Sequence, residues 1–224
     1  HTGFEPVTFV FNGEVEHRDS LGNESIIKAG GVQWITAGKG IVHSEKASAE
    51  FQKKGGEFEI IQLWINLPKA LKKTDPRYYG YDAEDIPFYL SNDKKTKLNV
   101  VAGNYKNITG PVDSVTNITA YTAYLDAFSN LELEFKDNEN VIFYVLNGHV
   151  RVDNNDIKDK QLGVFKRDES QINILSMLKS KLLILAGKPL KEPVYNYGPF
   201  VLNSKDEVID AINDYESGKM GFLQ

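Results

Sequence analysis

The chain has 224 residues, of which 41% are hydrophobic and 25% charged, a composition typical of an ordinary globular protein. Its net charge of −5 and pI near 5.5 argue against direct binding to nucleic acid or an anionic membrane, because both need a basic surface. It contains no cysteine, which excludes disulfides and thiolate-bound metals, and no apolar run of its sequence is long enough to span a membrane.

The first part of the chain is predicted to form short strands separated by turns. Apolar residues alternate over 5–11, and Asn12-Gly13, a strong hairpin signal, leads into a second strand over 14–19. Further strands are expected over 25–28, 32–36, 41–45, 58–67 and 97–102. Short strands at this close spacing are typical of a sandwich or barrel rather than of alternating strands and helices.

Three stretches between or within these strands carry expectations of their own. Residues 46–57 are polar and contain glycine, which predicts a loop, whereas the nearly continuous apolar run 58–67 predicts a strand buried on both faces. Residues 68–85 are charged and rich in tyrosine, which predicts a surface connector. Within that connector we expect Lys69, Lys72 and Lys73 to form a solvated basic surface.

The second part of the chain repeats the pattern of short strands. They are expected over 119–125, 131–135, 141–146, 149–152, 161–165, 171–175 and 181–186. The sequence YVLNGHVRV in this part resembles FVFNGEVEH near the start, and both place Asn-Gly after an apolar strand. This weak internal repeat predicts two related β-barrels in tandem.

The C-terminal residues form the one convincing helical pattern. Ser204 followed by Glu207 fits a capping box, and acidic residues in the first turn suit a helix N-terminus. We expect the helix to end near Gly218 and to pack on the outside of a barrel. Its predicted apolar stripe consists of Val208, Ile209, Ile212 and Tyr215.

The strongest chemical signal is the stretch GVQWITAGKGIVHSE, residues 31–45. His43 and Glu45 are two residues apart, so on a strand both side chains project from the same face. With a second imidazole from a neighbouring strand, they could form a facial site for iron with open coordination positions. Spacing alone leaves a second interpretation open, in which a histidine at a barrel rim lies beside a solvated glutamate.

Three stretches of the sequence are similar to the pirin family of the cupin superfamily. They are HTGFEPVTFVFNGEVEHRDSLGN, VQWITAGKGIVHSE and LLILAGKPLKEPVYNYGPFVLNSKDEVIDAINDYESGKMGF. The resemblance implies an all-β fold of two tandem, jelly-roll-like cupin barrels with a C-terminal helix. On this basis we expect an N-terminal metal-binding cupin domain over 1–105 and a C-terminal pirin-type cupin domain over 106–224.

The same resemblance implies a metal site in the N-terminal domain. The family places metal ligands at the positions of His43 and Glu45, and His1 matches a third ligand position. The family's fourth ligand is a histidine that precedes the position of His1, so the sequence is expected to lack its natural start. The implied metal is Fe(II), with another divalent transition metal as an alternative. Glu45 could also act as general base towards a bound hydroxyl group.

Other candidate ligands have weaker support. Glu5 occupies the position at which many cupins place a carboxylate ligand, but the pirin pattern assigns that role to Glu45 and makes Glu5 a structural partner. His17 is expected to be a structural histidine, hydrogen-bonded near the turn 19–23. His149 has no second histidine near it in sequence, so we expect the second barrel to hold no metal.

Four aromatic and amide side chains on the strands of the first barrel could contact a flat substrate. They are Gln33, Trp34, Gln62 and Trp64. Aromatic residues on such strands more often belong to the core, and we favour that interpretation.

By resemblance, the leading function is a quercetin 2,3-dioxygenase, which opens flavonol rings with O2. The alternative is a metal- or redox-sensitive regulator that binds transcription factors or metabolic enzymes without turnover, and a third is another cupin chemistry such as isomerisation. We expect a monomer in the cytoplasm, or also in the nucleus of a eukaryote, that binds neither nucleic acid nor membrane directly.

Overall fold

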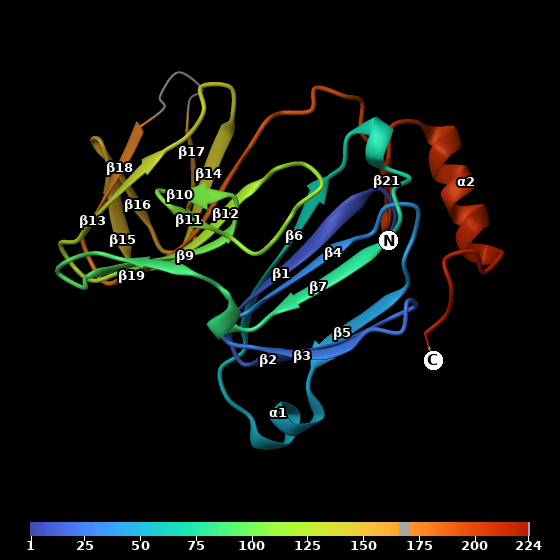
Figure 1. Cartoon of the computed structure of the whole chain (residues 1–224), viewed down its shortest axis with the longest axis horizontal. Coiled ribbons are helices and arrows are strands. Elements are labelled where there is room, and N and C mark those ends of the chain that lie inside the picture. The colour runs from blue at the N-terminus through green and yellow to red at the C-terminus, as the bar shows by residue number, and fades with distance from the viewer. Residues whose placement is uncertain (166–170, 224) are drawn as a thin grey trace. The chain divides into compact units, whose positions relative to one another are not determined.

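The computed structural model describes residues 1–165 and 171–223, and strands dominate it (Figure 1). The predicted all-β class and C-terminal helix are confirmed. The chain divides into two compact units. The first consists of His1–Asp85 together with Leu190–Gln224, and the second of Ile86–Pro189. This grouping differs from the predicted domains 1–105 and 106–224, because the chain leaves the first unit at residue 85 and returns to it at 190. No helix in the described part of the chain is long and apolar enough to cross a membrane.

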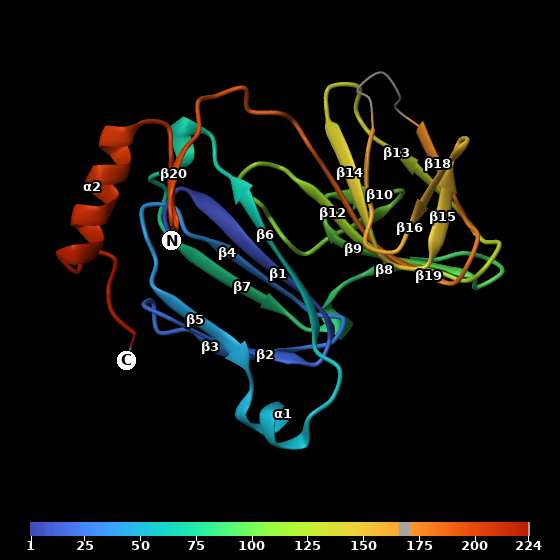
Figure 2. The same ribbon diagram turned by 180° about the vertical axis from the view of Figure 1, so that it is seen from behind.

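The first unit contains two antiparallel sheets. One has the order β6-β1-β4-β7 and the other the order β3-β2-β5. In chain order the strands are β1 Phe4–Asn12, β2 Glu14–Asp19, β3 Glu24–Lys28, β4 Val32–Thr36, β5 His43–Ala47, β6 Glu59–Asn66 and β7 Arg77–Tyr81. Apolar side chains from both sheets meet in a core that includes Val10, Val15 and Ile27, and Figure 2 shows the sheets as two layers.

Short helical segments and the C-terminal return complete the first unit. They are α1 Ala49–Lys54, the 3-10 turns Lys69–Leu71 and Ala83–Asp85, the strands β20 Tyr195–Tyr197 and β21 Phe200–Leu202, and the helix α2 Lys205–Glu216. The return is joined to the start of the chain by hydrogen bonds, since the Thr2 amide donates to Pro199 O and the Val201 amide donates to Thr2 O.

The second unit also has two main sheets. A six-stranded sheet has the order β17-β14-β19-β12-β9-β8, and a four-stranded sheet has the order β13-β18-β15-β16. In chain order the strands are β8 Phe88–Leu90, β9 Thr96–Ala102, β10 Asn104–Tyr105, β11 Ile108–Thr109, β12 Thr119–Leu125, β13 Asn130–Glu134, β14 Asn140–Asn147, β15 His149–Val152, β16 Asn155–Lys158, β17 Leu162–Val164, β18 Gln171–Ser176 and β19 Ser180–Gly187. The alternating inward side chains of these strands form one continuous apolar core.

Helix α2 begins as the sequence predicts, and only part of its predicted apolar stripe is buried. The Ser204 hydroxyl accepts a hydrogen bond from the Glu207 amide, which caps the first turn. Val208 and Ala211 are the buried residues, whereas Ile209 and Tyr215 are half exposed. The predicted stripe was therefore right for Val208 and Ile212 and wrong for Ile209 and Tyr215, and Ala211 joins Val208 in the cluster formed with β21.

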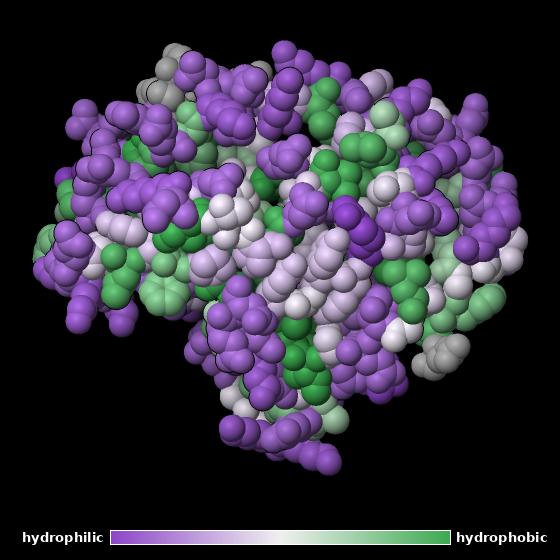
Figure 3. Space-filling model, viewed as in Figure 1, coloured by the Kyte–Doolittle hydropathy of each residue, from purple (hydrophilic) through white to green (hydrophobic). Residues whose placement is uncertain are grey.

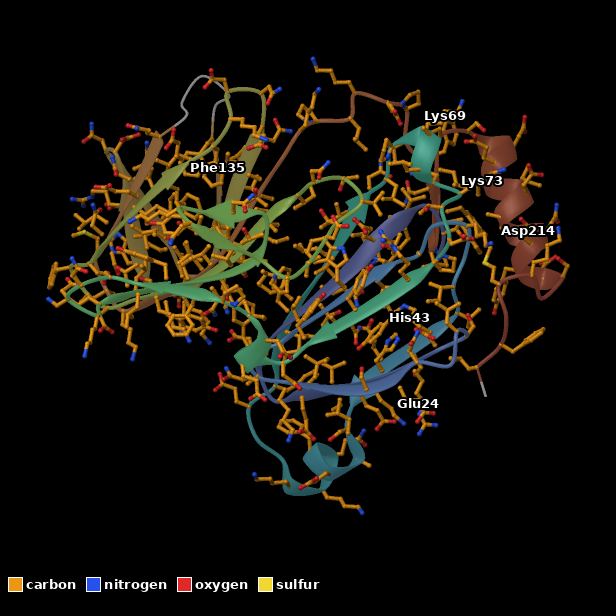
Figure 4. The ribbon with its side chains drawn as sticks, viewed as in Figure 1. Glu24, His43, Lys69, Lys73, Phe135 and Asp214 are labelled. Carbon is orange, nitrogen blue, oxygen red and sulfur yellow. The ribbon has the colours of Figure 1, made fainter. Side chains whose placement is uncertain are left out.

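Three other expectations need correction. Residues 46–57 contain helix α1, capped by Ser48, and the expected connector 68–85 contains strand β7, which pairs with β4. Strand β6 is half-buried rather than buried on both faces. Lys72 is only 2% exposed, whereas Lys69 and Lys73 are solvated as expected (Figure 4).

Lys72 is buried because three oxygen atoms surround its ammonium group. Nζ donates to Gly3 O at 2.8 Å, Asn66 Oδ1 at 2.6 Å and Val201 O at 2.8 Å. Burial lowers the pKa of Lys72 to about 8. The side chain thus joins the start of the chain to its C-terminal return.

Hydrophilic residues cover most of the molecular face shown in Figure 3.

Candidate metal centre

The sheet register of the first unit directs a row of polar side chains towards strand β5. Thr8 on β1 lies opposite Gln62 on β6 and opposite Gln33 on β4, so the three side chains share one face of the sheet. Strand β5 belongs to the other sheet and carries His43 and Glu45. Figure 4 shows the side chain of His43 in the space between β7 and β5.

Glu45 receives contacts on both carboxylate oxygens. Gln33 Nε2 donates to Oε1 at 2.6 Å, and His43 Nδ1 lies 3.1 Å from the same oxygen. Gln62 Nε2 donates to Oε2 at 2.7 Å, and the Thr8 hydroxyl donates to it at 3.1 Å. With a side chain only 12% exposed, Glu45 is a carboxylate held in place by polar neighbours.

His43 connects Glu45 to His1. His43 Nε2 lies 3.1 Å from His1 Nδ1, while its Nδ1 faces Glu45. Two nitrogens that bind one metal in cis positions at about 2.1 Å would be about 3 Å apart, which matches the His1–His43 separation. The structure therefore places the three residues predicted as ligands next to one another in the order His1, His43, Glu45.

The structure adds His17 to this neighbourhood. Potential ligand atoms of His17, His43 and Glu45 all lie within 4.8 Å of one another. His17 Nε2 lies 3.0 Å from Asp19 Oδ2, as expected of a structural histidine near the 19–23 turn, and its ring stacks on Tyr78 with centroids 4.3 Å apart. Sequence reasoning missed its proximity to the cluster, although the pairing of β2 with β5 sets His17 opposite Glu45.

Electrostatics favour a neutral His17. Burial lowers its pKa below the usual value, and the hydrogen bond from the ring to Asp19 only partly opposes the shift. A neutral ring that donates Nε2–H to Asp19 keeps an unprotonated Nδ1. That Nδ1 atom is buried and has no hydrogen-bond partner, so an electron pair remains available beside the cluster.

Glu5 does not belong to the group of possible ligand atoms formed by His17, His43 and Glu45. Its side chain is fully buried and accepts a hydrogen bond from the Thr36 hydroxyl at 2.7 Å. This contact fits the structural role expected from the pirin pattern.

The two tryptophans have different environments. Trp34 is fully buried, as expected for a core residue, but Trp64 is 48% exposed, so its assignment to the core was wrong. The Trp64 ring stacks on Phe4, with centroids 4.4 Å apart, and meets the His1 ring edge-on at 5.2 Å. An exposed aromatic surface therefore lies beside the histidines.

Comparison with known proteins identifies the family. The family profile named Pirin matches residues 1–65, and the profile named Pirin C-terminal cupin domain matches residues 120–221. A Pseudomonas aeruginosa protein named "Putative quercetin 2,3-dioxygenase" is 38% identical over 219 residues, which are 98% of this chain and 77% of that protein. The chain belongs to the pirin family.

Two further relatives agree with this pirin in sequence or fold. A pirin-like protein of Caulobacter vibrioides is 34% identical, with 98% of this chain and 78% of that protein covered. The crystal structure of a quercetin 2,3-dioxygenase from Acinetobacter baumannii superposes with a TM-score of 0.95 at 37% identity, covering 100% of this pirin and 78% of that chain. The agreement supports the bicupin fold of this pirin.

Proposed function

We propose that this pirin is an Fe(II)-dependent dioxygenase that acts on flavonols, with His1, His43 and Glu45 as metal ligands. The observation that carries the proposal is the grouping of His43 with His1 and Glu45, since its Nε2 lies 3.1 Å from His1 Nδ1 and Glu45 lies two residues further along the same strand. Imidazole and carboxylate form the ligand set of non-haem Fe(II) oxygenases, and they leave coordination positions open.

The donors of the site suit such an ion. A cation would be balanced by the Glu45 carboxylate, and neutral histidines can present unprotonated nitrogens. His17 offers a further buried nitrogen without a hydrogen-bond partner. We nevertheless assign the third ligand position to His1, because His17 is fixed between Asp19 and Tyr78 and is fully buried.

The surrounding residues suit a flat, hydroxylated substrate. When bound, the iron would supply a Lewis-acidic, redox-active centre with room for oxygen and a substrate hydroxyl. Glu45 is the base that could accept the proton of that hydroxyl. The exposed ring of Trp64 offers a stacking surface beside His1.

The proposal is tested by turnover. The protein is loaded anaerobically with Fe(II), mixed with quercetin and exposed to oxygen, and both oxygen uptake and carbon monoxide release are measured. We expect both, in equal amounts, because the ring is cleaved with loss of one carbon. A fully loaded protein that consumes no oxygen with quercetin would contradict the dioxygenase and would favour the regulatory alternative.

A further inference from the structure

Hydrogen bonds occupy both acceptor positions of Glu45 Oε2, whereas Oε1 accepts one hydrogen bond. A carboxylate has about four lone-pair positions, two on each oxygen. Here Gln33 and His43 approach Oε1, and Thr8 and Gln62 donate to Oε2. A hydroxyl group that binds Oε2 must therefore displace Thr8 or Gln62.

Gln62 is the neighbour that can leave most readily. Gln33 and Thr8 are fully buried on the inner face of the sheet, so neither can move without disturbing the packing. His43 is itself part of the proposed site. Gln62, by contrast, is an exposed residue of β6, and its bond to Glu45 lies at the surface.

Trp64 determines which way the amide of Gln62 points. The Trp64 indole N–H donates to Gln62 Oε1 at 3.2 Å. An indole nitrogen can only donate, so the oxygen of the amide must face Trp64 and the NH2 group must face Glu45. Its two hydrogens then reach Glu45 Oε2 at 2.7 Å and Thr8 Oγ1 at 3.1 Å. Every polar atom of the Gln62 side chain has a partner in this arrangement.

We propose that Trp64 and Gln62 form a positioning arm for Glu45, through which a planar aromatic ligand on the indole controls access to Oε2. The indole is suited to this because it is 48% exposed, while its stacking on Phe4 supports it from within the protein. The identity of the ligand rests on the function proposed above, whereas the positioning of Glu45 by the arm does not.

The arm responds to a ligand through hydrogen bonds alone. A ring that stacks on Trp64 and shifts the indole withdraws the N–H from Gln62 Oε1. The amide is then no longer held in one orientation, and its NH2 group can leave Glu45. Oε2 becomes available to a hydroxyl of the same ligand, so this oxygen is freed only when an aromatic ring is present, while Oε1 is not held by the arm.

Two Trp→Phe variants test the arm in the metal-free, ligand-free protein. Trp64→Phe keeps an aromatic ring but removes the N–H, and Trp34→Phe is the matched control in the core. The measurement is the hydrogen exchange rate of the Gln62 side-chain amide by NMR with 15N-labelled glutamine. We expect Trp64→Phe to raise the rate about tenfold, the effect of losing one ordinary hydrogen bond, and Trp34→Phe to leave it unchanged. Equal rates in Trp64→Phe and wild type would overturn the positioning role.

Quercetin is the probe for the ligand. In wild type we expect it to shift the indole N–H signal of Trp64, which the Trp34→Phe variant identifies, and to accelerate exchange of the Gln62 amide. A shifted indole signal with an unchanged Gln62 amide would overturn the coupling alone. An indole signal that quercetin leaves unshifted would overturn the role of Trp64 as the ligand's stacking surface, whereas the flavonol substrate is decided separately by oxygen uptake and carbon monoxide release. The Trp64→Phe result would still decide whether the arm positions Glu45.

Discussion

The two units each contain a histidine–carboxylate pair after an Asn-Gly turn, and the pairs differ in burial. In the first unit, His17 Nε2 lies 3.0 Å from Asp19, and both side chains are fully buried. In the second, His149 Nε2 lies 3.1 Å from Asp156, with the side chains 21% and 39% exposed. The two pairs therefore have similar local sequences and similar N···O distances but lie in different environments.

The difference in environment comes from the partners of each pair. Asp19 also accepts hydrogen bonds from the amides of Leu21 and Asn23 and from the Asn23 side chain, and Tyr78 covers His17. Asp156 is bound mainly by the exposed Arg151, whose hydrogen bonds lower the pKa of Asp156 to about 2. The first pair differs from the second in its burial and in its position beside His43 and Glu45. Among the described residues, only the first unit contains a group of side chains that could hold a metal ion.

The largest expected effect is on metal binding. We expect His43→Ala to lower Fe(II) affinity by more than about 100-fold, beyond the usual effect of an outer-shell change, because it removes the central ligand. His149→Ala should leave affinity unchanged. Anaerobic titration with Fe(II) measures both, and equal losses would remove the contrast between the units.

The third ligand is decided by the same titration. We expect His1→Ala to weaken Fe(II) binding and His17→Ala to retain it, since the Asp19 bond and the Tyr78 contact give His17 a structural role. If His17→Ala abolishes binding and His1→Ala does not, the third ligand is His17.

The next effect is on stability. Asp19→Ala should lower the free energy of unfolding by about 3 kcal/mol, because it leaves several buried donors without an acceptor. Asp156→Ala should have no measurable effect, since exposed ion pairs contribute little. Urea unfolding at neutral pH checks both, and similar losses in the two variants would contradict the difference in burial.

The loss in Asp19→Ala should also depend on pH. Hydrogen bonds lower the pKa of Asp19 below its usual 3.8, although burial acts in the opposite direction as the largest single influence. A lowered pKa stabilises the fold above pH 4, and this contribution disappears as the pH falls through the folded-state value. The stability gap between wild type and variant should therefore narrow in acid.

A variant of Lys72 tests how the two chain segments of the first unit, 1–85 and 190–224, are held together. Lys72→Met should cost about 2 kcal/mol of unfolding free energy, because the ammonium group donates to backbone oxygens of both segments. The pKa of Lys72 is about 8 in the folded state and 10.5 ordinarily, so between pH 8 and 10.5 the unfolded chain binds more protons than the folded chain. Wild-type stability should gain from this group as pH rises from 8 to 10.5, a gain that Lys72→Met lacks. Parallel pH profiles of the unfolding free energy in wild type and Lys72→Met would contradict the lowered pKa of Lys72.

The smallest effect compares the two Asn-Gly turns. Gly13 and Gly148 both have positive φ, 82° and 101°, so alanine costs about 1 kcal/mol at either. A Cβ at 148 would lie 2.5 Å from Lys179 O, a backbone atom, whereas at 13 its nearest neighbour is the Phe58 ring at 2.8 Å. We expect Gly148→Ala to lower the melting temperature more than Gly13→Ala. The opposite order would mean that the second turn adapts more easily.

Sequence predicted the strands well where local signals were strong. The alternation and Asn-Gly turns predict β2, β4, β12 and β15 with their observed bounds. Strand β7 was missed because its tyrosines and charges resemble a surface segment, and only pairing with β4 makes it a strand. Lys72 was placed in solvent for a related reason, since its oxygen partners come from distant parts of the chain.

The candidate site was predictable only in part. The spacing of His43 and Glu45 places both on one strand face, and the pirin resemblance adds His1. Sequence could not show that Gln33 and Gln62 donate to Glu45 or that Trp64 is exposed, because both depend on the register between strands far apart in the chain.

The most direct test of the metal centre is anomalous diffraction from crystals of the protein loaded anaerobically with Fe(II). We expect one strong iron peak in the first unit, about 2.1 Å from a ring nitrogen of His43 and at a similar distance from Glu45. A peak beside His149, or full occupancy of iron at a position that touches neither His43 nor Glu45, would contradict the proposed site.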